Sequence, residues 1–141
     1  QPLRIVLDRK LQLSHTHNLY KPEARTWIVN EHKGGDEEHI SFIRLRFDET
    51  LIPTLLQRLH EANILSLIVE GGEKLLNTFI AQDLWDEARI LTGQVTLPNG
   101  SILSPVLNNA ALAFTTDIAT DKLNVFVNNK SAYKYVPGME L

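Results

Sequence analysis

Short apolar runs, separated by polar and turn-forming segments, dominate the first part of the chain. Runs at residues 3–8, 26–29 and 39–47 are rich in β-branched and other apolar residues, which is typical of strands. The segment 30–38 lies between the last two runs, is polar and contains two glycines, so we expect a surface loop there. The beginning of the chain therefore predicts three strands.

Two amphipathic helices are predicted on either side of a further apolar run. Residues 51–63 and 72–82 each place apolar side chains at helical spacing along one face. The run between them, residues 66–70, reads Ser-Leu-Ile-Val-Glu and predicts a buried strand, and another strand is expected at 87–91. Strands that alternate with helices in this way favour a mainly parallel sheet with right-handed crossovers.

The C-terminal part has a different pattern. Residues 92–107 contain several glycines and prolines and predict a long irregular connection. Residues 112–120 and 122–128 predict a closing antiparallel hairpin, and we expect a loose tail after residue 130. The chain has no internal repeat or linker, so we predict a single α/β domain over 1–141. Its mixed, mainly parallel sheet would have flanking helices and the C-terminal hairpin.

Composition excludes several classes of function. A net charge of −3 gives no electrostatic reason to expect a nucleic-acid partner or an anionic membrane surface. No apolar stretch reaches the roughly 18 residues that a membrane-spanning helix needs. The chain has no cysteine, which excludes disulfides, thiolate catalysis and cysteine-ligated zinc and fits a reducing cytoplasm.

The most prominent candidate site is the sequence Glu70-Gly71-Gly72, where a predicted strand meets a predicted helix. Ligands of open α/β sheets collect at the carboxyl ends of strands, and the start of a helix suits a phosphate. Glycine would let a ligand approach the main chain and would permit backbone conformations closed to other residues. Glu70 could bind an amino group or handle a proton. The alternative is a tight turn with a solvated carboxylate, and spacing alone does not separate the two interpretations.

Other candidate chemistry is weaker. His15 and His17 lie two residues apart and would face the same side of a strand. Zinc sites in proteins need three or four ligands, and the sequence offers no third ligand at a suitable spacing from these two histidines. We therefore expect no metal site. No serine lies in a nucleophile-elbow context.

Three segments in order, residues 2–13, 64–80 and 83–91, resemble the reductase domain of the bifunctional riboflavin-biosynthesis deaminase/reductase. The most specific part is Val-Glu-Gly-Gly at 69–72, followed by a helix and by Leu-Trp-Asp-Glu at 84–87; after residue 91 the resemblance fades. The resemblance implies a dihydrofolate-reductase-like fold and a homodimer in the cytoplasm. It also implies NADPH-dependent reduction of the ribosyl group of 5-amino-6-(5-phosphoribosylamino)uracil to the ribityl product.

The resemblance assigns roles to individual residues. Glu70 matches the substrate-binding carboxylate, and Arg9 matches a cofactor-contacting position, where a cation would suit the 2′-phosphate of NADPH. Without the resemblance, Arg9 would be interpreted as a solvated charge in a turn. Asp86 and Glu87 match a pattern that we interpret as structural and not catalytic, with the two residues capping or pairing near the turn from helix to strand. No proton donor is identified for the hydride transfer to C1′ of the opened ribosyl group. The segment that matches the cofactor-binding stretch comprises Gly72, Glu73, Lys74, Leu75, Leu76, Asn77 and Thr78.

The chain also departs from the family pattern. The family's full protein begins with a zinc deaminase domain that needs cysteine ligands, and this chain has none. The earlier half of the reductase domain has no counterpart in 1–141. We therefore expect the chain to be the later part of such a domain and, by itself, weakly active or inactive. Two alternatives are a dihydrofolate-reductase-like enzyme with another substrate and a non-catalytic module that dimerises through the C-terminal hairpin.

Overall fold

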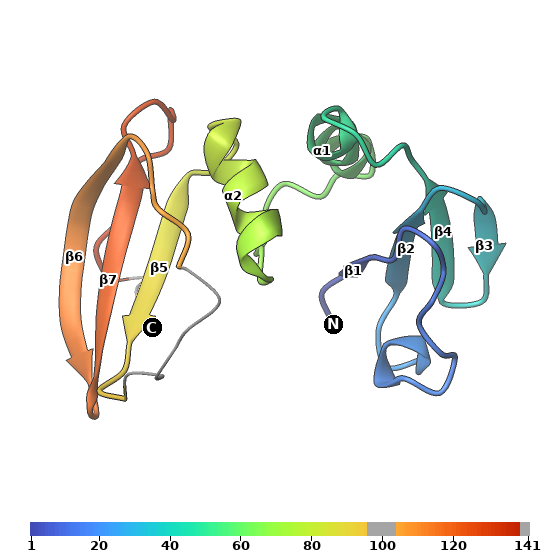
Figure 1. Cartoon of the computed structure of the whole chain (residues 1–141), viewed down its shortest axis with the longest axis horizontal. Coiled ribbons are helices and arrows are strands. Elements are labelled where there is room, and N and C mark those ends of the chain that lie inside the picture. Colours follow the sequence, from blue (N-terminus) through green and yellow to red (C-terminus); the bar gives the residue numbers. More distant parts are fainter. Residues whose placement is uncertain (96–103, 139–141) are drawn as a thin grey trace. The chain divides into compact units, whose positions relative to one another are not determined.

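The computed structural model describes residues 1–95 and 104–138 (Figure 1). The chain divides into two compact units, residues 1–67 and residues 68–141. The expectation of a single domain over 1–141 stays a prediction. Within the described residues, no helix has both the length and the apolar character that a bilayer crossing requires.

The first unit contains a four-stranded sheet, coloured blue to teal in Figure 1. Its strands are β1 (Arg4–Leu7), β2 (Thr26–Asn30), β3 (Gly35–Glu37) and β4 (Ile40–Arg44), in the spatial order β1-β2-β4-β3. β1 and β4 both run parallel to the central strand β2, and β3 pairs antiparallel with β4. The predicted mixed, mainly parallel sheet is therefore confirmed.

Strand β3 was not expected, because it lies inside the segment 30–38 that the sequence predicts as a loop. All three of its residues are exposed, so no alternation of apolar and polar positions marks it as a strand. Gly35 has a φ of +116° and Glu38 a φ of +50°, so positive-φ residues stand at the start of this strand and just after its end. β3 forms because backbone pairing to β4 needs no buried side chain.

Apolar side chains cover both faces of this sheet. Ile28 and Val29 are neighbours on β2 and point to opposite faces, and neither is exposed to solvent. Ile28 packs with Ile40 and Phe42, whereas Val29 packs with residues of helix α1 (Leu51–Glu61). A 3₁₀ turn, η1 (Asn18–Tyr20), lies in the connection from β1 to β2 and contributes to the first of these two clusters. A parallel sheet needs cover on both faces, and both faces are covered here.

The apolar run at 66–70, predicted as a buried strand, belongs to no strand in the structure. Leu65 and Ile68 are 83% and 86% exposed, and residues 65–70 make no backbone hydrogen bond with another described residue. A strand exists only where a neighbouring backbone supplies hydrogen-bond partners. The side-chain pattern alone therefore gave the wrong secondary structure at this position.

The second unit combines helix α2 (Glu73–Ala81) with a three-stranded antiparallel sheet. The strands are β5 (Glu87–Thr92), β6 (Ala110–Ile118) and β7 (Asp121–Asn128), in the spatial order β5-β7-β6. β6 and β7 form the predicted closing hairpin, with a register shift between Leu112 and Phe114. β7 carries the buried apolar residues of this sheet; they are Leu123 and Val125.

The connection predicted as irregular, residues 92–107, is described only in part. Residues 96–103 lie outside the described residues. Residues 93–95 and 104–107 belong to no helix or strand, as predicted. β5 extends one residue further than expected, to Thr92, because that residue pairs with Lys122 of β7.

Candidate functional site

The lead into α2 combines an exposed carboxylate with two glycines. Glu70 is exposed, and Gly72 occupies the N-cap position of the helix with φ −71° and ψ 164°. Neither glycine has a positive φ, so the expectation that they supply a conformation closed to other residues is wrong. What Gly72 provides is space, because a Cβ atom there would meet no atom within 4 Å. At Gly71, in contrast, a Cβ atom would lie 3.0 Å from Cδ2 of Leu75.

The start of α2 has free backbone donors. No side chain caps this end, and the N–H groups of Glu73 and Lys74 bond to no described residue. The N–H groups of Leu75 and Leu76 both donate to the carbonyl of Gly72, at 3.1 and 3.3 Å. Free N–H groups and the positive end of the helix dipole attract an anion, and the exposed Lys74 adds a positive charge. The arrangement suits a phosphate group.

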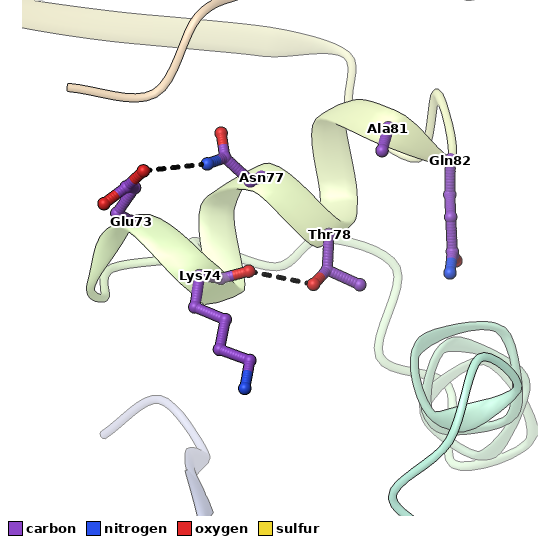
Figure 2. A pocket seen from close by; sticks show the side chains of 6 residues that line it. All are labelled: Glu73, Lys74, Asn77, Thr78, Ala81 and Gln82. Carbon is purple, nitrogen blue, oxygen red and sulfur yellow. Dashed lines mark hydrogen bonds between the residues drawn. The ribbon is translucent and has the colours of Figure 1, made fainter. Parts of the chain in front are cut away.

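An open groove runs along one side of α2 (Figure 2). Its lining forms two rows at a spacing of four residues, and these rows are Glu73-Asn77-Ala81 and Lys74-Thr78-Gln82. The amide of Asn77 donates to Oε1 of Glu73 at 3.5 Å, and the hydroxyl of Thr78 donates to the carbonyl of Lys74 at 2.9 Å. Polar side chains along the groove are thus held partly by one another and partly by the helix backbone.

The groove includes four of the residues that the resemblance assigns to the cofactor: Glu73, Lys74, Asn77 and Thr78. Leu75 and Leu76 do not line it and are half-buried instead. Ala81 and Gln82 also line the groove, although the resemblance assigned them no role. A signal for both was present, because each continues a row of the helix at the next i+4 position.

Arg9 lies in the first unit, in the turn that follows β1. Its Nε donates to Oε2 of Glu31 at 2.7 Å, and its guanidinium carbon lies 5.9 Å from the centroid of the Phe47 ring. The hydrogen bond and the charge of Glu31 raise the pKa of Arg9. The same hydrogen bond lowers the pKa of Glu31, and a second bond from the backbone N–H of Phe47 lowers it further. Arg9 is therefore exposed to solvent, but its guanidinium also has partners in Glu31 and Phe47.

Asp86 and Glu87, predicted as structural pairing residues, both have partners. Oδ1 of Asp86 accepts a hydrogen bond from the Ser131 hydroxyl, and Oε2 of Glu87 accepts one from the Tyr133 hydroxyl at 2.8 Å. The bond to Glu87 raises the pKa of Tyr133. The pairing prediction is confirmed, and the expected loose tail is wrong at these two positions, where its side chains are tied to the start of β5.

His15 and His17 lie in a turn and not on a strand. The ring of His15 packs against Tyr20, with 4.5 Å between ring centroids. Among the residues that the structure describes, no three His, Asp or Glu side chains are grouped so that they could hold a metal ion.

Comparison with known proteins identifies the family. The sequence profile of the RibD C-terminal domain family matches residues 1–111. The chain belongs to this family. The match begins before β1, includes both Arg9 and the whole of α2, and ends at the second residue of β6. The predicted family is therefore confirmed, and over a longer stretch than the resemblance covered.

Two curated relatives of this RibD-type chain are 32% identical to it. One is the 2,5-diamino-6-ribosylamino-4(3H)-pyrimidinone 5′-phosphate reductase of Archaeoglobus fulgidus, matched over 67% of this chain and 46% of the relative. The other is the riboflavin biosynthesis protein RibD of Bacillus amyloliquefaciens, matched over 76% of this chain and 30% of the relative. The chain thus spans less than half the length of each of these relatives.

Solved structures support the same fold. The deaminase/5-amino-6-(5-phosphoribosylamino)uracil reductase of Thermotoga maritima matches 90% of this chain and 38% of its own, with a TM-score of 0.69 and 22% identity. The riboflavin biosynthesis reductase Rib7 of Saccharomyces cerevisiae matches 89% of this chain and 69% of its own, with a TM-score of 0.69 and 19% identity. The predicted fold class, a dihydrofolate-reductase-like α/β fold, is confirmed.

Proposed function

We propose that this RibD-type chain takes part in riboflavin biosynthesis. In this proposal it reduces the ribosyl group of 5-amino-6-(5-phosphoribosylamino)uracil to the ribityl product. The observation that carries the proposal is the family match over residues 1–111, which includes the Glu70-Gly71-Gly72 sequence and α2. The name of the Bacillus amyloliquefaciens relative states this pathway, and the Archaeoglobus fulgidus relative is named as the reductase of a related ribosylamino-pyrimidinone phosphate. Because the chain spans only part of those relatives, we expect it to be weakly active or inactive by itself.

NADPH is the proposed cofactor, and it would supply the hydride that reduces C1′ of the substrate. We assign its phosphates and adjoining ribose to Gly72–Thr78. The free N–H groups of Glu73 and Lys74 would donate to a phosphate oxygen, and Gly72 leaves room for that oxygen beside the main chain. Asn77 and Thr78 would offer amide and hydroxyl groups to the ribose along the groove. Arg9 would contact the 2′-phosphate of the cofactor.

Glu70 is the proposed substrate-binding residue. Glu70 is exposed and immediately precedes the two glycines that lead into α2. An ionised carboxylate accepts hydrogen bonds only, so it would select amino or hydroxyl groups of the phosphoribosylamino-pyrimidine. In this role Glu70 binds and orients the substrate.

The proposal includes a homodimer in the cytoplasm. Dimerisation is supported by the sheet of the second unit, on which the register places Ile90, Leu112 and Phe126 on one face. Leu112 is 56% exposed and Ile90 is 37% exposed. A second copy of the chain would cover these side chains, because an exposed apolar sheet face favours association. Sedimentation of the purified chain would test this part directly.

The cofactor assignment can be tested with a substitution that the fold tolerates. Gly72→Ala adds a methyl group in open space at an ordinary φ, so the fold accommodates it, and the exchange of glycine for alanine at an N-cap should cost no more than about 1 kcal/mol. The methyl group would occupy the approach to the helix start, and we expect NADPH to bind at least about tenfold more weakly in a calorimetric titration. The same titration with NADH would show whether the cofactor site distinguishes the two.

Gly93→Ala is the matched control. A Cβ atom at Gly93 would make only an ordinary contact, 3.7 Å from Oδ1 of Asp121, and Gly93 lies away from α2. This variant should bind NADPH like the parent chain. Equal binding by the Gly72→Ala variant would refute the assignment of the phosphates to the start of α2. The family membership does not depend on that outcome.

A further inference from the structure

Arg9 is the one candidate cofactor residue whose side chain is held by several partners. The carboxylate of Glu31 binds its Nε, and the ring of Phe47 lies beneath its guanidinium carbon. Glu31 is itself fixed, because its other oxygen, Oε1, accepts the backbone N–H of Phe47 at 3.1 Å. The carboxylate therefore bridges the arginine to the backbone of the residue whose ring lies below that arginine.

The main chain around Arg9 is held as firmly as its side chain. The carbonyl of Arg9 accepts the backbone N–H of Glu31 at 3.1 Å. The preceding residue, Asp8, is buried, and its two carboxylate oxygens each accept a backbone N–H at 2.9 Å, from Gln12 and from Leu13. These bonds close the turn after β1. The position of the Arg9 side chain is thus set by the fold on both sides of the residue.

The geometry leaves one edge of the guanidinium open. An arginine carries five N–H donors in a planar fork. Glu31 uses the Nε donor, and the two Nη groups of Arg9 bond to no other described residue. The side chain is 55% exposed, so these groups face solvent. Two parallel N–H donors in one plane match a phosphate, which they bind in a bidentate manner.

We propose that Glu31 is a positioning residue, which holds the Arg9 guanidinium so that its Nη edge receives the 2′-phosphate of NADPH. Through Arg9, Glu31 then contributes to the choice of NADPH over NADH. This inference rests on the proposed function, in which Arg9 contacts that phosphate. Glu31 itself touches Arg9 and the backbone of Phe47 and would not touch the cofactor.

The proposal predicts an effect opposite in sign to that of charge alone. Glu31 is a negative charge beside a site for an anion, so its field weakens phosphate binding. If the field were its only influence, removal of the charge would tighten NADPH binding. If Glu31 positions Arg9, removal of the carboxylate lets the guanidinium leave its productive orientation and weakens NADPH binding. The direction of the change therefore separates the two roles.

The test is a calorimetric titration of the full chain with NADPH and with NADH. Glu31→Gln keeps an oxygen for the N–H of Phe47 but cannot accept the charge-assisted bond from Arg9. We expect the variant to bind NADPH about threefold to tenfold more weakly and to bind NADH as the parent does. Glu37→Gln is the matched control, since Glu37 is also paired with a cation in this unit, namely Lys33, and should leave both affinities unchanged.

An Arg9→Ala background distinguishes the possible failures. In that background, Glu31→Gln should not change the NADPH affinity further, because the arginine that Glu31 would position is absent. A parent chain that does not favour NADPH over NADH, or an Arg9→Ala variant that binds NADPH normally, overturns the proposed cofactor contact and this inference together. If Arg9→Ala weakens binding while Glu31→Gln leaves it unchanged or tightens it, only the positioning role fails.

A second measurement does not require cofactor binding. The Arg9 Nε–H signal in a nitrogen-15 NMR spectrum should be sharp and protected from exchange in the parent chain, because Glu31 holds it. Glu31→Gln should broaden or remove that signal, and Glu37→Gln should leave it unchanged. An unprotected Arg9 signal in the parent chain would contradict the positioning role directly.

Discussion

The two compact units differ in how apolar side chains cover their sheets; the first unit comprises residues 1–67 and the second residues 68–141. The first unit has a mainly parallel sheet whose two faces are both packed with apolar side chains. The second unit has an antiparallel sheet. Apart from Leu65, every large apolar side chain that is exposed in the described part of the chain belongs to this second unit. An antiparallel sheet can leave a face open, and a parallel sheet rarely does.

The two units also differ in the part of the proposed function that each one carries. The first unit carries Arg9 in a turn that hydrogen bonds of Asp8 and Glu31 hold in place. The second unit holds the proposed phosphate-binding helix, and its sheet carries exposed apolar side chains that the proposed dimer would cover. Substitutions in the two units should therefore have unequal effects on stability.

The largest expected effect comes from the core of the first unit. Leu59 of α1 is 2% exposed and packs in the cluster around Val29. Leu59→Ala would leave a cavity in that cluster and should lower the free energy of unfolding by about 2–5 kcal/mol. Urea denaturation followed by circular dichroism would measure it. The same change in the second unit, Leu91→Ala, removes a side chain that is 62% exposed and should cost less than about 1 kcal/mol. Equal losses would contradict the contrast between the units.

A smaller effect is expected from Asn30, which is fully buried at the end of β2. Its amide nitrogen donates to the carbonyls of Ile28 and Lys33 at 3.1 and 3.0 Å. Its amide oxygen accepts the backbone N–H groups of His32 and Lys33 at 2.8 and 2.7 Å. Asn30→Ala removes these four bonds, one of which is fully buried and three partly buried. We expect a loss of about 1–3 kcal/mol in the same denaturation experiment.

Asn128 occupies the corresponding position at the end of β7 and sharpens the comparison. Its amide nitrogen donates to the carbonyl of Trp85 at 2.9 Å, and its amide oxygen accepts the backbone N–H of Lys130 at 3.0 Å. Asn128→Ala should therefore destabilise the protein less than Asn30→Ala. Asn108→Ala, at an exposed position, serves as the control and should change stability by no more than about 0.5 kcal/mol. A reversed order would show that the number of bonds does not set the cost.

The smallest effects should come from surface carboxylates in acid. In the second unit, hydrogen bonds from Lys130 and then Asn109 lower the pKa of Asp83; in the first, Arg9 and then Phe47 lower that of Glu31. A lowered pKa in the folded state stabilises the fold above the ordinary carboxyl value of about 4, and that contribution is lost as the pH falls through the lowered value. We expect the melting temperature to fall in that range, and to fall less for Asp83→Asn. An unchanged acid profile for this variant would exclude a contribution from Asp83.

The sequence predicted most elements of both units, and it failed where side-chain pattern and backbone pairing disagree. The run at 66–70 has the composition of a buried strand but no partner, whereas β3 has partners but no apolar side chain. At the candidate site, residue types and their spacing led to Glu70 and Gly72, and the family resemblance led to Arg9. They did not lead to Glu31, which lies 22 positions from Arg9. Only the parallel pairing of β1 with β2 brings the two residues that follow these strands together.

The edge position of strand β3 has a consequence for the assembly of the first unit. β3 forms one edge of the four-stranded sheet, where an unpaired backbone would otherwise accept a strand from another molecule. The strand is only three residues long, and two of them, Asp36 and Glu37, are exposed acids. A second copy approaching this edge would meet the carboxylate of Asp36 over a length too short for a stable ladder. The polar composition of residues 30–38, which led to the prediction of a loop, therefore makes this edge a poor template for aggregation.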